Sequence, residues 1–88
     1  MDPSQNDYKE ILTEIIKKQT VILGPQIALL KAKGVVGLSL SDDGKVLNIA
    51  GDPQEVLQKV IDQYVALSGE IVKNAVNSIF AKYPSFKR

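Results

Sequence analysis

The chain has 88 residues, of which 44% are hydrophobic and 24% charged, and its net charge at pH 7 is +1. A chain of this length forms one domain, over residues 1–88. Its apolar fraction is too high for a disordered chain. Its net charge is too small for a general attraction to nucleic acid or anionic membranes. Because the chain has no histidine and no cysteine, catalytic Ser–His and Cys–His pairs, ordinary zinc sites and haem ligation by these residues are excluded.

Apolar residues recur at helical spacing through the N-terminal third of the chain, which predicts a helix there. We expect residues 1–7 to be frayed, with Ser4 or Asn6 available as a helix cap. Gly24 and Pro25 interrupt the pattern, because proline removes a backbone hydrogen bond and clashes with the preceding turn. Either one long helix is kinked there, or Pro25 begins a short second helix.

Residues 36–51 predict a β-hairpin. Asp43 and Gly44 are a strong signal for a two-residue type I′ turn, in which both central residues have positive φ. The cross-strand pairs that follow from this turn are Asp42–Lys45, Ser41–Val46, Leu40–Leu47, Ser39–Asn48 and Leu38–Ile49.

Side chains alternate between the two faces of a strand, so this register predicts which residues face the core. Ser39, Ser41 and Asn48 fall on the outer face together with Val46, the one apolar exception. The residues predicted to face the core are Val36, Leu38, Leu40, Leu47 and Ile49.

A long helix is predicted to follow the hairpin over residues 53–83. Asp52 is a good N-cap, and Pro53 suits the first helical position, where its missing N–H costs nothing. Pro84 ends the apolar pattern, after about 30 residues or about 45 Å of helix. We expect residues 84–88 to be frayed.

The predicted C-terminal helix is apolar over more than one narrow stripe. Ser68 and Gly69 weaken its middle, as a bend or as a notch where another helix approaches closely. One hairpin and one kinked helix do not easily cover so wide a face, so we expect a second copy of the chain to cover it. The alternative is that the first helix folds back and covers the face by itself. The residues predicted to form the interface are Val56, Val60, Leu67, Gly69 and Ile71.

Candidate catalytic residues are few. Asp42 and Asp43 are the only adjacent acidic pair, and turn formation accounts for them. A calcium or magnesium site needs more oxygen ligands at suitable spacing. The glycines at 34 and 37 do not form a phosphate-binding pattern. We therefore predict no catalytic activity, no cofactor and no metal site.

The combined prediction is an α+β domain of αββα order, with a long kinked N-terminal helix, a two-stranded antiparallel hairpin and a long C-terminal helix. Its expected function is that of a homodimeric protein-interaction or regulatory module, with another protein as a further partner. The dimer pairs either helices in a bundle or hairpin edges in a sheet, and both geometries stay open.

The expected location and the alternative function depend on the first residues, the length of the apolar runs and the surface lysines. The first residues lack the basic and apolar regions of a signal peptide, and no apolar run is long enough to cross a membrane, so we expect a cytoplasmic protein without a membrane partner. The alternative function is nucleic-acid binding through surface lysines, although nearby carboxylates dilute their charge. The basic candidates are Lys17, Lys18, Lys31, Lys33, Lys82, Lys87 and Arg88.

Overall fold

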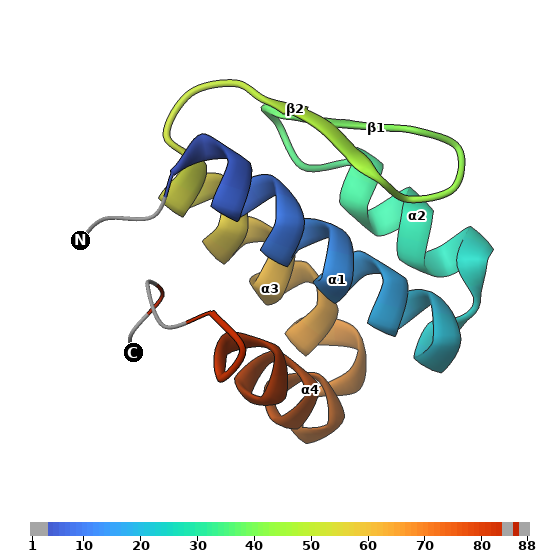
Figure 1. The fold of residues 1–88 in the computed structure, drawn as a ribbon. Helices are drawn as coiled ribbons and strands as arrows, with labels where there is room; N and C mark the ends of the chain where they lie inside the picture. The colour runs from blue at the N-terminus through green and yellow to red at the C-terminus, as the bar shows by residue number, and fades with distance from the viewer. Residues whose placement is uncertain (1–3, 84–85, 87–88) are drawn as a thin grey trace.

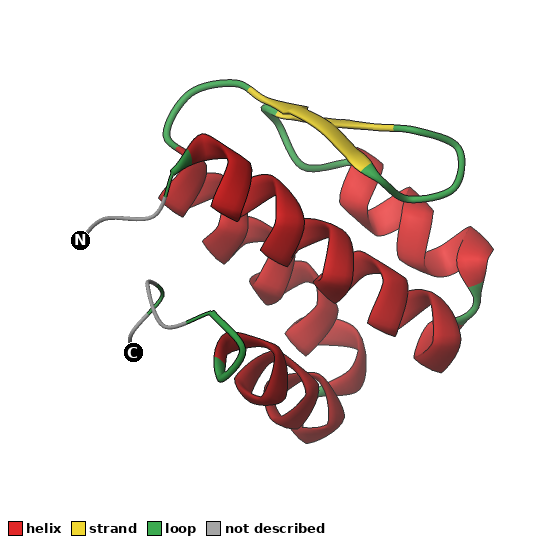
Figure 2. Ribbon diagram, in the orientation of Figure 1, coloured by secondary structure: helices red, strands yellow, loops and turns green. Residues whose placement is uncertain are grey.

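The computed structural model describes residues 4–83 and Phe86 of the chain. These residues form four helices and one two-stranded antiparallel hairpin, which confirms the predicted α+β class. Each of the two predicted long helices is a pair of helices separated by a single glycine. In chain order the elements are α1 (Gln5–Leu23), α2 (Pro25–Lys33), β1 (Leu38–Leu40), β2 (Val46–Ile49), α3 (Pro53–Ser68) and α4 (Glu70–Phe80) (Figure 1, Figure 2).

Helix α1 lies at the centre of the fold and contacts α2, α3, α4 and β2. The hairpin and α4 lie on opposite sides of α1 (Figure 1). This central position explains the regular apolar spacing of α1, because a helix that packs on one stripe needs apolar residues every three or four positions. The buried apolar residues of α1 are Tyr8, Ile11, Leu12, Ile15 and Ile16.

The start of α1 is fixed by a reciprocal cap. The Ser4 hydroxyl accepts a hydrogen bond from the Asp7 amide at 3.1 Å, and the Asp7 carboxylate accepts one from the Ser4 amide at 3.0 Å. Such a capping box satisfies two amides that have no partner within the helix. The helix therefore begins at Gln5, which corrects the expectation that residues 1–7 are frayed for the part that the structure describes.

Gly24 separates α1 from α2, so the chain is broken rather than kinked at this point. Gly24 has φ +90° and ψ 151°, a conformation that side chains with a Cβ rarely adopt. Pro25 is the first residue of α2, the position at which proline is tolerated in a helix.

The hairpin turn is one residue longer than predicted. The Ser41 amide donates to the Lys45 carbonyl at 2.9 Å and the Gly44 amide donates to the Ser41 carbonyl at 3.1 Å, which leaves three residues in the loop. Among the described residues only glycines have positive φ, so Asp43 cannot take its place in a type I′ turn. The bonds and the φ of +89° at Gly44 match a three-residue loop that ends in a glycine bulge.

The longer loop changes the register on the side of β2 next to the turn. The predicted pairs Leu38–Ile49 and Ser39–Asn48 are confirmed, but Leu40 pairs with Val46 instead of Leu47. Leu47 is thus the extra residue of a bulge and is 54% exposed, whereas Val46 is buried. Both side chains lie on the opposite face to the predicted one. Val36, also predicted to face the core, is exposed as well.

The predicted long C-terminal helix is divided at Gly69. Helix α3 begins as expected, because the Asp52 carboxylate accepts a hydrogen bond from the Gln54 amide at 3.0 Å. It ends at Ser68, and Gly69 has φ +59° and ψ −119°. This break turns α4 back onto α1, where it buries Val72, Val76 and Ile79.

Phe86 closes one end of the core. Its ring is buried and meets the ring of Tyr8 edge to face, with 4.8 Å between the ring centroids. Phe80 and Tyr83 also lie beside it. The expectation of a frayed end is therefore wrong at Phe86, while residues 84, 85, 87 and 88 lie outside the described residues.

Candidate interaction surface at the Gly69 turn

The structure separates the five residues predicted to form an interface into two groups. Val56 and Val60 are buried in the core of the single chain, where α3 packs against α1 and α2. These two residues are therefore not available to a partner. Leu67 is 44% exposed and Ile71 is 58% exposed, on either side of Gly69.

Gly69 is the whole connection between α3 and α4. Its amide donates to the Val65 carbonyl at 2.8 Å, and its carbonyl accepts from the Val72 and Lys73 amides at 3.1 and 3.2 Å. The first amides of α4 receive no side-chain cap. A Cβ placed on Gly69 would meet no heavy atom within 4 Å, so the turn is open to its surroundings.

Two further exposed apolar residues, Val21 and Ile22, lie in the last turn of α1. The end of α1 and the α3–α4 junction lie at the same end of the helices (Figure 1). Ile22 is one of the apolar residues whose helical spacing predicts the first helix. A usable signal was present, because three successive apolar residues, 21–23, cannot all lie on one face of a helix.

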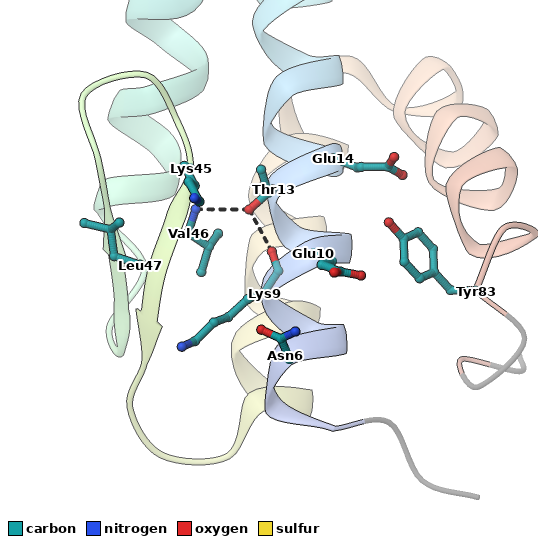
Figure 3. A pocket seen from close by; sticks show the side chains of 9 residues that line it. All are labelled: Asn6, Lys9, Glu10, Thr13, Glu14, Lys45, Val46, Leu47 and Tyr83. Carbon is teal, nitrogen blue, oxygen red and sulfur yellow. Dashed lines mark hydrogen bonds between the residues drawn. The ribbon is translucent and has the colours of Figure 1, made fainter.

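A second feature is an open groove of about 570 Å³ between α1 and β2. It is lined by Asn6, Lys9, Glu10, Thr13, Glu14, Lys45, Val46, Leu47 and Tyr83 (Figure 3). Thr13 anchors β2 to α1, because its hydroxyl accepts from the Val46 amide at 3.0 Å and donates to the Lys9 carbonyl at 2.7 Å. This groove was not predicted from the sequence.

Charges of both signs line this groove. Lys9 and Lys45 lie towards the hairpin, whereas Glu10 and Glu14 lie on the side of α1 that faces Tyr83 (Figure 3). Burial and the charges of these two glutamates raise the pKa of Tyr83. Such mixed charges do not favour a strongly charged ligand of either sign.

Two of the lysines already have acidic neighbours. Lys82 lies 3.9 Å from Glu14, and Lys73 lies 3.9 Å from Glu70. Lys82 was one of the basic candidates for nucleic-acid binding, and the nearby carboxylate reduces the positive potential around its ammonium group. Nucleic-acid binding stays a prediction, for which salt-dependent retention on a nucleic-acid column is the direct measurement.

Within residues 4–83 and Phe86, no group of three or more carboxylates is placed to hold a metal ion. The helices in this part of the chain are also too short or too polar to cross a membrane. Comparison with known proteins finds no matching family model, no matching curated protein and no matching solved structure. The candidate site is therefore argued from the geometry of this chain alone.

Proposed function

We propose that the chain is a small cytoplasmic interaction or regulatory module that acts as a homodimer and has no catalytic activity of its own. The observation that carries the proposal is the pair Leu67 and Ile71, two large aliphatic side chains exposed on either side of an open glycine turn. Single exposed apolar side chains are common, but several at one end of a small domain indicate a contact surface.

The position of the turn supports self-association. Val21 and Ile22 add apolar surface at the end of the molecule where Gly69 lies. Because glycine has no side chain, a second backbone can approach Gly69 closely. Burial of these aliphatic groups against a second copy would contribute about 25 cal/mol for each Å² removed from water.

Sedimentation equilibrium tests this proposal on the unmodified protein. We expect the apparent mass to rise from the chain mass of 9.6 kDa towards twice that value as the concentration increases through the micromolar range. A mass that remains at 9.6 kDa at high micromolar concentration contradicts the homodimer.

A further inference from the structure

The junction of α3 and α4 combines two properties. The apolar pattern is continuous through residues 53–80, as it is in one uninterrupted helix, yet the chain reverses at the single residue Gly69. Hinges this short favour the exchange of a whole element between copies, because the same contacts can form between two chains.

We propose that two copies of this chain dimerise by exchanging α4. In the exchanged dimer Gly69 becomes helical, residues 53–80 form one continuous helix, and each α4 packs on the α1 of the other copy. This inference rests on the proposed homodimer and specifies its geometry.

The backbone is already close to this arrangement on one side of the hinge. The Gly69 amide donates to the Val65 carbonyl, which is the bond that a continuous helix would also contain. A helix leaves its last carbonyls and its first amides without partners inside the helix, and α4 has no side-chain cap to satisfy its amides. In one straight helix the first amides of α4 would pair with the last carbonyls of α3.

The other glycine break provides an internal comparison. Gly24 also has positive φ and also joins two helices through one residue. Pro25 follows it, however, and a straight helix through Pro25 would lack one amide and place the ring against the carbonyl of Val21. The chain therefore cannot form one straight helix through Gly24. Glu70, which follows Gly69, does not prevent a straight helix through the second break.

Exchange conserves the contacts that α4 makes in the single chain. Its buried residues Val72, Val76 and Ile79 would pack on the partner copy in the same way. The ion pair between Lys82 and Glu14 would then join two different chains.

In the exchanged dimer, the exposed side chains on either side of the hinge can pack against each other. Leu67 and Ile71 are four positions apart, so in a straight helix they lie on one face. The two hinge segments of an exchanged dimer lie next to its two-fold axis, where these faces can cover each other.

Three substitutions test the hinge. Gly69→Ala removes access to the reversed conformation and favours the straight helix, so we expect the dimer dissociation constant to fall by about tenfold or more. Glu70→Pro reproduces the Gly24–Pro25 sequence, in which proline prevents a straight helix. Proline is tolerated at the first position of α4, so this variant is expected to fold and to stay monomeric.

Gly24→Ala is the matched control, which should lose stability without forming more dimer. A Gly69→Ala chain that is monomeric or unfolded overturns the exchange.

A cross-link distinguishes an exchanged dimer from a dimer of intact monomers. Chains labelled with ¹⁴N and with ¹⁵N are mixed equally, unfolded and refolded together, and the dimer fraction is treated with a carbodiimide, which joins neighbouring amines and carboxylates. The side chains of Lys82 and Glu14, 3.9 Å apart, should be linked in either dimer. Exchange predicts that about half of these links join a ¹⁴N peptide to a ¹⁵N peptide.

The outcomes separate the two proposals. Links that join only peptides of the same label, in the unmodified dimer or in the Gly69→Ala dimer, overturn the exchange. In the unmodified dimer, that result leaves self-association intact. An unmodified chain that stays monomeric contradicts the homodimer, while mixed labels in the Gly69→Ala dimer still support the exchange geometry.

Discussion

The Tyr64 hydroxyl donates a hydrogen bond to the backbone carbonyl of Ala28 at 2.7 Å, which joins α3 to α2 inside the core. Tyr64 is fully buried, so this bond satisfies a polar group that water does not reach. Tyr64→Phe removes the hydroxyl and leaves the ring. We expect the free energy of unfolding, measured by urea denaturation at pH 7, to fall by about 1 kcal/mol.

The same pair predicts a pH dependence. Burial raises the pKa of Tyr64 above its ordinary value of 10.0. Above about pH 10 the unfolded chain loses this proton while the folded chain keeps it, so the contribution of Tyr64 to stability falls as the pH rises. Urea denaturation at pH 8 and pH 10.5 should show a smaller loss of stability for Tyr64→Phe than for the unmodified protein. Equal losses would show that Tyr64 is not protected in the folded state.

We expect an apolar substitution at Gln19 to stabilise the folded chain. Its side chain is fully buried, and neither its amide nitrogen nor its amide oxygen has a hydrogen-bond partner among the described residues. Burying a polar group without a partner costs free energy that an apolar side chain of similar size does not cost. Gln19→Leu should therefore raise the free energy of unfolding by about 1–2 kcal/mol.

Gln26, an exposed residue of α2, is the control for this substitution. Gln26→Leu should change stability by less than about 0.5 kcal/mol, because the side chain is already in water. If Gln19→Leu lowers the stability instead, the amide of Gln19 is satisfied in solution.

Gly44 predicts a strongly destabilising substitution in the hairpin loop. Its φ is +89°, and a Cβ there would lie 3.2 Å from Leu29 and 3.3 Å from Ile16. Gly44→Val adds a β-branched side chain to this strained and crowded position, so we expect a loss of about 2–3 kcal/mol in a thermal or urea melt. Gly34 has an ordinary negative φ and room for a Cβ, so Gly34→Ala should be nearly neutral. Similar melts for the two variants would contradict the loop geometry.

We expect a charged substitution at Ile71 to dissociate the dimer without unfolding the single chain. Because its side chain is 58% exposed, Ile71→Glu should not unfold the single chain. In a dimer, however, it would place an unpaired charge in an apolar contact, which should raise the dissociation constant by about tenfold or more in sedimentation experiments. Leu47→Glu is the control, because Leu47 is similarly exposed but lies on the hairpin. An equal effect of both substitutions would place the interface elsewhere.

The hairpin and the Gly69 end show which features could be predicted from the sequence and which could not. Two of the five predicted hairpin pairs and the cap at Asp52 are confirmed, because turn residues, capping residues and alternation act over a few neighbouring positions. The exchange of Leu47 for Val46 on the inner face was not predictable from alternation, because the extra loop residue shifts the register only as far as the bulge at Leu47, beyond which the predicted pairs return.

Local signals also located the weak point at Gly69, but they did not decide between a bend and a continuous helix. That choice depends on whether the free energy gained when α4 packs on α1 exceeds the free energy lost by breaking the helix at the turn. The helical spacing of the apolar residues is the same in both states, so it does not decide between them. The sequence by itself determined the start of α3, the presence of the hairpin and the absence of histidine and cysteine chemistry. Only the tertiary structure decided that Val56 and Val60 are buried while Leu67 and Ile71 stay exposed, because burial depends on which distant segment packs against a face.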